Sequence, residues 1–295
     1  MAYNAKVLAD SISEAGDRLT TMEVTLPRIV LAEFNTHRMF SRNSASSRAI
    51  PPAKQIQRVL DDPFIPVYWG VNEKGMQATA ELEGDDRQAA LDKWLEARDA
   101  AVHYASNLAV MNVHKQTLNR LLEPFMWQTI IVTATEWSNF YALRANPDAQ
   151  PEIRIAAEMM QAEHSTSQPT VLTNGEWHLP LIQPDERDGV FEKTLNARQI
   201  SAARCARVSY LTQDGVRDYS ADLTLYRRLV SGGHMSPLEH VATPFEYSET
   251  GYVFNDHGLS ARVPRISPWS GNFHGWKQFR KTIVNENDFS KIAKG

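Results

Sequence analysis

Asn35-Thr-His-Arg-Met-Phe-Ser-Arg-Asn-Ser-Ala-Ser-Ser-Arg-Ala-Ile-Pro51 is a polar run that directly follows an apolar segment of the chain. It combines one imidazole, three guanidinium groups, four serines and two asparagines. Arginine presents a planar fork of donors that matches phosphate, and serine hydroxyls and backbone amides can complete the shell around phosphate oxygens. The composition therefore indicates an anion-binding loop, with a plain solvated Ser/Asn/Arg loop as the alternative.

The composition of the whole chain limits what this loop can serve. The 295 residues allow one large domain or two small ones, and hydrophobic content of 42% with 22% charged residues is ordinary for a soluble globular protein. The formal net charge of -4 argues against a general nucleic-acid binder, because that role needs a positive field over much of the surface. Basic chemistry is therefore expected only locally.

Cys205 is the only cysteine, so the chain can form neither an intrachain disulfide nor a cysteine-based zinc cluster. Its Ala/Arg surroundings contain no neighbouring histidine, which predicts a thiol that packs as a small hydrophobe and not as a nucleophile. The N-terminus lacks an apolar signal core, and no run of about 18 apolar residues suggests a membrane span. We expect a cytoplasmic protein.

The spacing of apolar residues predicts the elements around the polar run. Alternation predicts a strand from Arg18 to Leu31 that is bent or broken at Pro27 and delivers the run to a sheet edge. Residues 61–84 contain prolines and glycines without a clean period and are expected to be irregular. A long helix is predicted from Asp85 to about Ala109, because apolar residues recur there at helical spacing.

The second half of the chain is also predicted to contain helices. Pro151 is placed in the first turn of one helix, and His164–Pro169 is expected to be a loop. Another helix is expected from an N-cap at Ser220 to a stop at Gly232-Gly233. The predicted fold is α+β, a mostly antiparallel sheet flanked by several helices, in a single domain over residues 1–295 with halves at 1–170 and 190–295.

The spacing His37-Arg38-x-x-Ser41-x-Asn43-x-x-Ser46-x-Arg48 resembles the signature of the flavin-dependent thymidylate synthases (the ThyX family), Arg-His-Arg-x-x-Ser-x-Asn-Glu-x-Ser-x-Arg-Tyr. The sequence keeps six of those positions. It departs from the signature at three others, namely Thr36 for the first arginine, Ser44 for glutamate and Ala49 for tyrosine.

A second stretch is similar to the family pattern Asn-Phe-x-x-Leu-Arg followed by Ala-Gln-x-Glu-Ile. Asn139, Leu143 and Arg144 match the first part, and 149–153 match the second. Three family residues are replaced: a flavin-contacting Asn and Arg become Thr133 and Thr135, and a histidine becomes Asp148.

Two further pieces, residues 203–210 and His234-Met-Ser-Pro-Leu-Glu-His240, resemble motifs that stand near the N-terminus in the family. Here they follow the signature, so the resemblance covers most of the chain in a rearranged order. Such a permutation is allowed where termini lie close together at the surface. We therefore expect the loop His234–His240 to return in space against the loop His37–Arg48, within one subunit or across an interface.

The resemblance implies a homotetramer that binds FAD between its subunits. NADPH would reduce the FAD, and the enzyme would take a methylene group from methylenetetrahydrofolate and convert dUMP to dTMP. Implied substrate residues are Glu33, Ser46, Ser47, Arg48, Arg120 and Arg144, with Arg144 and Ser46 as the catalytic pair. Implied flavin residues are His37, Arg38, Asn43, Asn139, Leu143, His234, Ser236 and Glu239. Ser46 and Arg48 would hold the phosphate with Arg120, and Arg144 would stabilise negative charge that develops on the pyrimidine.

Several alternatives stay open. Glu33 stands where the family usually has glutamine, so a cytosine nucleotide (dCMP), or transfer of hydroxymethyl instead of methyl, fits as well. His234, Glu239 and His240 could form a metal site, but they lack a convincing fourth ligand, and no metal is expected. A non-catalytic nucleic-acid-binding protein that uses the Arg/Ser loop is the third reading. We expect no stable nucleic-acid partner and no membrane partner.

Overall fold

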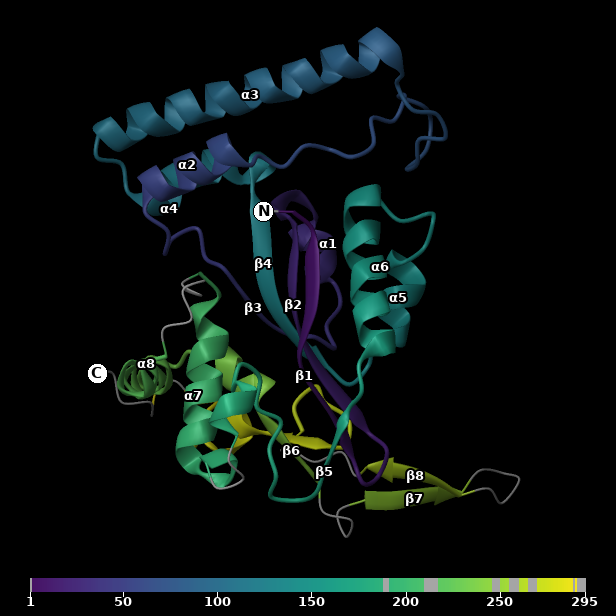
Figure 1. The fold of residues 1–295 in the computed structure, drawn as a ribbon, viewed down its shortest axis with the longest axis vertical. Coiled ribbons are helices and arrows are strands. Elements are labelled where there is room, and N and C mark those ends of the chain that lie inside the picture. Colours follow the sequence, from purple (N-terminus) through teal and green to yellow (C-terminus); the bar gives the residue numbers. More distant parts are fainter. Residues whose placement is uncertain are drawn as a thin grey trace.

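The computed structural model describes residues 2–187, 191–209, 217–245, 250–254, 260–264, 270–288 and 290, and its main element is a five-stranded sheet (Figure 1). The strand order is β3-β4-β2-β1-β5. The bounds are β1 (Asn4–Ser13), β2 (Arg18–Pro27), β3 (Ser41–Ser44), β4 (Trp127–Ala134) and β5 (Thr170–Leu172). All neighbouring strands are antiparallel except β1 and β5, which are parallel. The predicted α+β fold with a mostly antiparallel sheet is confirmed.

Helices and short strand pairs surround this sheet. The α-helices are α1 (Leu31–Asn35), α2 (Pro52–Asp61), α3 (Gly84–Val110), α4 (Lys115–Leu118), α5 (Ser138–Arg144), α6 (Pro151–Thr166), α7 (Leu195–Ala206) and α8 (Tyr219–Ser231). The 3-10 helices are η1 (Arg28–Val30), η2 (Asn119–Phe125), η3 (Pro184–Glu186), η4 (Phe191–Lys193), η5 (Arg207–Ser209), η6 (Ser236–His240) and η8 (Phe279–Thr282). The short antiparallel pairs are β6 (Ala242–Pro244) with β9 (Trp276–Gln278), and β7 (Thr250–Phe254) with β8 (Ser260–Pro264).

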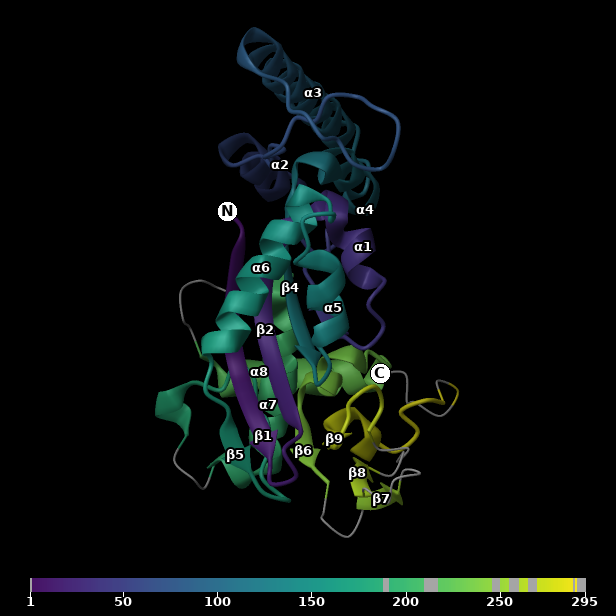
Figure 2. The same cartoon turned by 90° about the vertical axis from the view of Figure 1, so that its right-hand side faces the viewer.

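Alternation along β2 puts its apolar and polar side chains on opposite faces of the sheet. Met22, Val24 and Leu26 are fully buried on one face, where the apolar sides of α5 and α6 close the core. Figure 2 shows α5 and α6 lying along this face. The predicted helix that starts at Pro151 is confirmed, and its apolar stripe is the side that packs on the sheet.

The opposite face of the sheet is buried too, although it is polar. Thr21 of β2 and Thr133 of β4 are both 0% exposed. Their hydroxyls are bonded to two histidines of the C-terminal half, Thr21 to His178 and Thr133 to His240. In Figure 1, α7 and α8 lie on the side of the sheet away from α5 and α6. The C-terminal half therefore covers the polar face and satisfies its hydroxyls, as buried polar groups require.

The long helix predicted at 85–109 is confirmed as α3, and 62–83 lacks any regular element except a single β-bridge between Gly70 and Glu81. A small apolar cluster joins α3 to α2 and η2, with Ala105 buried at its centre. The indole of Trp94 donates to the carbonyl of Phe64 at 2.8 Å and attaches α3 to the preceding connection. Figure 1 shows α2, α3 and α4 at the end of the sheet opposite β6–β8.

Three predicted boundaries are wrong. The strand ends at Pro27, and residues 28–35 are helical because Val30, Leu31 and Phe34 together bury one helical side in the core. The last helix begins two residues earlier than expected, since the N-cap is Asp218 and not Ser220, and the Asp218 carboxylate accepts the backbone N–H of Ala221 at 2.9 Å.

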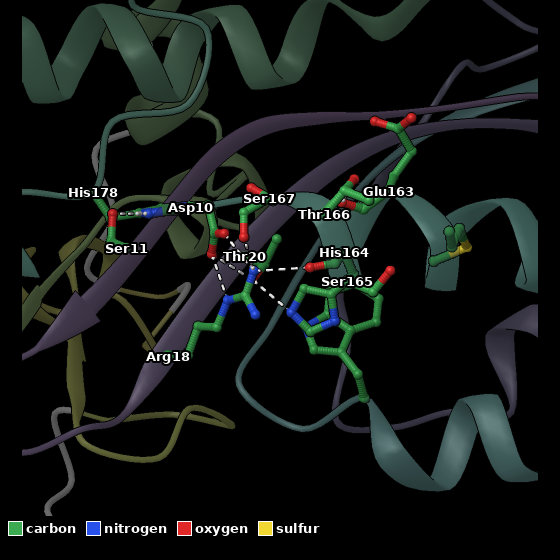
Figure 3. Close-up of polar contacts among 12 residues, drawn as sticks. Asp10, Ser11, Arg18, Thr20, Glu163, His164, Ser165, Thr166, Ser167 and His178 are labelled. Atoms are coloured by element: carbon green, nitrogen blue, oxygen red, sulfur yellow. Dashed lines mark hydrogen bonds and ion pairs between the residues drawn. The ribbon is translucent and has the colours of Figure 1, made fainter. Parts of the chain in front are cut away.

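The third wrong boundary is the start of the loop expected at His164, because α6 continues to Thr166. Arg18 explains the extension, since its Nη2 donates to the backbone carbonyls of His164 at 2.9 Å and Ser167 at 3.2 Å. The same guanidinium forms a two-bond pair with Asp10, at 2.9 and 2.6 Å (Figure 3). A cation that caps the free carbonyls of the last turn stabilises that turn.

Cys205 is fully buried in α7 against Ile131 of β4, as its surroundings in the sequence predicted, and burial raises the pKa of its thiol. Among the described helices, none is both long and apolar enough to cross a membrane.

Candidate functional site

Arg42 shapes the turn that joins α1 to the edge strand β3. Its Nη1 donates to the carbonyl oxygens of Asn35 at 2.9 Å and His37 at 3.1 Å, and it lies 3.5 Å from that of Phe34. A guanidinium shared among carbonyls supplies the partners that a helix or strand would otherwise provide, so the turn has a defined shape. Arg38 projects from this turn into solvent.

Arg144, the last residue of α5, lies against this turn. Its Nε donates to Nε2 of His37 at 3.1 Å, and its Nη2 lies 3.5 Å from Oγ1 of Thr36. His37 is 8% exposed, and its ring meets Phe140 edge-on with centroids 4.9 Å apart. Burial lowers the pKa of His37, and the cations of Arg144 and Arg42 lower it further. The imidazole is therefore neutral, and it orients the Arg144 guanidinium as an acceptor.

The other edge of the site is the contact between β3 and η6. Nδ2 of Asn43 lies 3.3 Å from Oγ of Ser236, and Oδ1 of Asn43 lies 2.9 Å from Nε2 of His240. The hydroxyl of Ser41 donates to Glu239 at 2.8 Å. The expected return of His234–His240 against the first loop is thus observed, and it occurs within one chain.

Glu239 has partners for both carboxylate oxygens. Oε2 accepts the Ser41 hydroxyl, and Oε1 pairs with Nη1 of Arg280 at 2.5 Å. Arg280 in turn pairs with Glu286 at 2.7 Å. The carboxylate thereby ties η6 to β3 on one side and to η8 on the other. A direct contact between Glu239 and a ligand stays a prediction.

His240 uses both ring nitrogens inside the protein. Nδ1 lies 2.7 Å from the Thr133 hydroxyl and Nε2 lies 2.9 Å from Asn43, while the ring is 0% exposed. A metal ligand needs a free ring nitrogen, so His240 is not available for one. In the part of the chain that the structure describes, no group of three or more metal-binding side chains occurs.

The segment that would hold a phosphate begins where β3 ends. Asn119 of η2 donates through Nδ2 to the backbone carbonyls of Ser47 at 2.8 Å and Ile50 at 3.1 Å. Arg48 is exposed, whereas Ser46 and Ser47 are half-buried. Arg120, next to Asn119, pairs with Glu123 at 2.7 Å and keeps about half of its side chain in solvent. The backbone of the serine segment is therefore held, while the Arg48 side chain projects outward.

Arg144 and this phosphate segment lie toward opposite ends of β3. Ser41, at the end near His37 and Arg144, pairs with Thr133, whereas the N–H of Ala45 bonds to the carbonyl of Thr129. Ala45 follows Ser41 by four positions, which corresponds to about 13 Å at the usual rise of a strand. One chain by itself thus presents the two halves of the implied substrate site apart from each other.

The other predicted site residues flank Arg144 or η6. Asn139 and Leu143 are exposed on α5, and His234 is exposed just before η6. Glu33, one helical turn before Thr36, has its Oε2 buried without a hydrogen-bond partner among the described residues. A buried carboxylate oxygen left unpaired is costly.

Sequence reasoning missed Thr21 and His178 behind the site, and it identified Thr133 only as the replacement of a family residue. Thr21 and Thr133 are cross-strand partners with hydroxyls 2.6 Å apart, and His178 bonds to Thr21 at 2.8 Å. The only signal in the sequence is the polar half of the alternating pattern in the two strands. That pattern cannot say which distant residue will cover it.

Comparison with known proteins adds a family. The family model described as thymidylate synthase complementing protein matches residues 18–170, about half of the chain. The match includes β3 and α5 and ends before η6. No curated protein sequence matches the chain.

Two solved structures of the UMP/dUMP methylase PolB from Streptomyces cacaoi match part of the chain. The one bound with 5-Br dUMP is 14% identical, with 56% of this chain and 90% of that chain covered and a TM-score of 0.44. The one bound with 5-Br UMP is 16% identical, with 56% and 89% covered and a TM-score of 0.45.

Proposed function

Because the chain belongs to the family of thymidylate synthase complementing proteins, we propose that it is a FAD-dependent methyltransferase that converts dUMP to dTMP. Methylenetetrahydrofolate is the one-carbon donor in this proposal, and NADPH is the reductant. The observation that carries it is the meeting of two motif segments, at Asn43 and Ser236, in one place of the fold. Each segment alone has only part of the polar groups that a flavin and a nucleotide need.

The residues at the β3–η6 contact fit the polar edge of a flavin. Asn43 is half-buried, and Ser236 and His234 are exposed beside it, so donors and acceptors line a surface that a ligand can reach. Asn139, Leu143, His37, Arg38 and Glu239 complete the proposed flavin residues. FAD, when bound, supplies the hydride that reduces the transferred carbon.

Arg144 and Ser46 carry the proposed substrate chemistry. A cation held at the pyrimidine carbonyl stabilises negative charge on the ring and so activates it without a covalent adduct to the enzyme. His37 supports this role, because its neutral Nε2 accepts the Nε–H of Arg144 and leaves the other guanidinium nitrogens for the substrate. Ser46, Ser47, Arg48 and Arg120 hold the phosphate.

The buried thiol supports a route without cysteine. Cys205 is 0% exposed and its raised pKa keeps it protonated at neutral pH, so it cannot act as the thiolate nucleophile that a cysteine-based methylation needs. The fixed cation of Arg144 takes over the activation of the pyrimidine ring.

A second candidate function is methyl or hydroxymethyl transfer to dCMP. The unpartnered Oε2 of Glu33 favours it, since a carboxylate oxygen can accept the amino group of cytosine. Turnover measured with dCMP and dUMP at equal concentration discriminates the two substrates. A preference for dCMP that Glu33→Gln reverses supports the second candidate, and turnover of dUMP alone in both proteins excludes it.

The proposed function is tested by an absorbance spectrum of the purified protein and by two arginine variants. Bound FAD should give a flavin spectrum, and dUMP should be methylated in the presence of NADPH and methylenetetrahydrofolate. Arg144→Ala should lower kcat by roughly 100- to 1000-fold, the usual loss for a removed charge-stabilising donor, whereas Arg48→Ala should mainly raise the KM for dUMP.

Arg87→Ala is the matched control, because Arg87 lies on α3, outside the proposed site, and its guanidinium faces Glu81 at 3.6 Å. It should leave both constants unchanged. Near-wild-type kinetics in both Arg144→Ala and Arg48→Ala would refute the assignment. A nucleic-acid-binding protein would instead lack flavin and bind nucleic acid with strong salt dependence.

A further inference from the structure

A continuous row of hydrogen bonds crosses the sheet and ends at Asn43. Its members are Ser11, His178, Thr21, Thr133, His240 and Asn43, named below the hydroxyl–imidazole chain. The successive distances are 2.8 Å from Ser11 to His178, 2.8 Å to Thr21, 2.6 Å to Thr133, 2.7 Å to His240 and 2.9 Å to Asn43. Figure 3 shows its first bond, between Ser11 and His178. All five links are short enough to be good hydrogen bonds.

The members of the hydroxyl–imidazole chain are electrically neutral. Thr21, Thr133 and His240 are 0% exposed, His178 is 1% exposed, and burial lowers the pKa of both imidazoles to about 3. A neutral imidazole has one N–H and one acceptor nitrogen, and each hydroxyl has one proton. Among the described residues the Thr21 and Thr133 hydroxyls bond only to members of this row, so each uses its single proton along it. Every inner member then donates one bond and accepts one, and all five bonds point in the same direction.

Two directions satisfy every member. In one, Ser11 donates first and His240 carries its proton on Nε2, which points at Oδ1 of Asn43. In the other, Nδ2 of Asn43 donates to Nε2 of His240, and both imidazoles carry their protons on Nδ1. Both directions hold the same number of protons. The change from the first direction to the second takes up one proton at Ser11, moves each inner proton one bond toward Asn43 and releases one proton beside Asn43.

The orientation of the Asn43 amide is coupled to this direction. With Oδ1 toward His240, Nδ2 faces the Ser236 hydroxyl at 3.3 Å. With the amide rotated by half a turn, Nδ2 donates to Nε2 of His240 at 2.9 Å and reaches the backbone carbonyls of Arg42 at 3.2 Å and Ser236 at 3.3 Å. The rotated state gives Nδ2 three acceptors, so it is the resting state without ligand, and it turns Oδ1 toward the exposed Ser236 hydroxyl.

We propose that the hydroxyl–imidazole chain makes Asn43 a two-state positioning residue, which presents either its N–H or its C=O to the polar edge of a bound flavin. The proposal rests on the proposed function. The edge of the flavin ring accepts a hydrogen bond when the flavin is oxidised and donates one when it is reduced. It therefore needs an N–H partner in the first state and a C=O partner in the second. A ligand shifts such an equilibrium by its differential affinity for the two states, and the buried chain reverses with it.

Thr133→Val is the test, because it interrupts the chain at its centre while keeping the shape of the side chain. The matched control is Thr129→Val, since Thr129 forms the equivalent cross-strand pair with Thr25, at 3.1 Å on the same two strands, outside the chain. Thr133→Val should change the ratio of the dissociation constants for oxidised and reduced FAD by about five- to thirty-fold, the effect of one unmet buried hydrogen bond. Thr129→Val should leave the ratio unchanged.

A second readout does not need flavin. NMR of protein labelled with ¹⁵N at histidine reports which nitrogen of each ring carries the proton, and His178→Gln and His240→Gln assign the two signals. Both rings should carry the proton on Nδ1 in the ligand-free protein. In Thr133→Val, His240 loses its acceptor at Nδ1 and should change to the Nε2–H form, and Thr133→Ser should restore Nδ1–H.

Each outcome supports or overturns the proposal. Opposite tautomers of His178 and His240 in the ligand-free protein would overturn it, as would an unchanged His240 tautomer in Thr133→Val. If Thr133→Val does not fold, a ratio for His178→Gln equal to that of the wild type would overturn it in the same way. If the wild type does not bind FAD, the proposed function fails by itself. The histidine tautomers then still show whether the hydrogen bonds of the hydroxyl–imidazole chain share one direction.

Discussion

Burial of His178 and His240 makes two imidazoles sensitive to acid. Their folded pKa of about 3 lies below the ordinary value of 6.5, so the unfolded chain binds more protons than the folded one between these values. The free energy of unfolding therefore rises with pH through this window and is lost as pH falls below about 6.5. The two buried histidines thus make the stability of the protein depend on pH.

At the residue scale, we predict how steeply the free energy of unfolding changes with pH. Between about pH 6 and 4, each buried imidazole should contribute about 1.4 kcal/mol of lost unfolding free energy per pH unit. His178→Gln should remove one such contribution, measured by urea unfolding at a series of pH values. His103→Gln, at an exposed position of α3, controls for the loss of an imidazole. An unchanged slope in His178→Gln would show that the ring is charged or exposed before unfolding.

At the scale of elements, one ion pair joins three of them. Arg18 of β2 pairs with Asp10 of β1 at 2.6 Å and caps the last turn of α6 through the carbonyls of His164 and Ser167. The Asp10 side chain is 4% exposed, whereas that of Arg18 is 30% exposed. Burial by itself raises the pKa of Asp10, but hydrogen bonds from Arg18, Ser167 and Thr20 reverse this, so its pKa is lowered overall.

Arg18→Met should lower the free energy of unfolding by about 1–3 kcal/mol, because it leaves the buried Asp10 carboxylate and two helix-end carbonyls with fewer partners. Water that enters at the partly exposed Arg18 position compensates for part of this loss. Asp10→Asn combined with Arg18→Met should cost less than the sum of the single variants, because the two residues share one interaction. Unfolding in urea measures all three variants. Strict additivity would mean that the pair contributes nothing to stability.

At the scale of the whole molecule, the separation of Arg144 from Arg48 along β3 has a consequence for assembly. Ser41 and Ala45 lie about 13 Å apart along this edge, so a nucleotide that needs both arginines is held more readily between copies of the chain than within one. This arrangement favours the homo-oligomer that the family resemblance implies.

Mixing Arg144→Ala with Arg48→Ala tests this shared site. Each variant alone should be nearly inactive at low dUMP, but unfolding and refolding the two together should restore part of the activity, because mixed oligomers contain sites with both arginines intact. Light scattering gives the oligomeric state in the same samples. Activity of the mixture equal to the mean of the two separate variants would place the complete site within one chain.

Local periodicity explains how much of the fold could be predicted from the sequence. The strand that starts at Arg18, the helix at 84–110, the helix start at Pro151 and the buried solitary Cys205 all follow from patterns that span a few residues. The resemblance also identified both segments that meet at Asn43 and Ser236. The errors at 28–31 and His164–Thr166 have a tertiary cause, namely packing on the sheet and capping by Arg18.

By itself, therefore, the sequence determined one strand and three helices and identified the motif-bearing segments, because these patterns depend on residues a few positions apart. Only the tertiary structure decided what covers the polar face of the sheet. The bonds that join Thr21 to His178 and Asn43 to His240 connect residues 157 and 197 positions apart. A hydroxyl in a strand looks the same in the sequence whether water or a distant imidazole accepts its proton, and the order in which the elements pack selects between them.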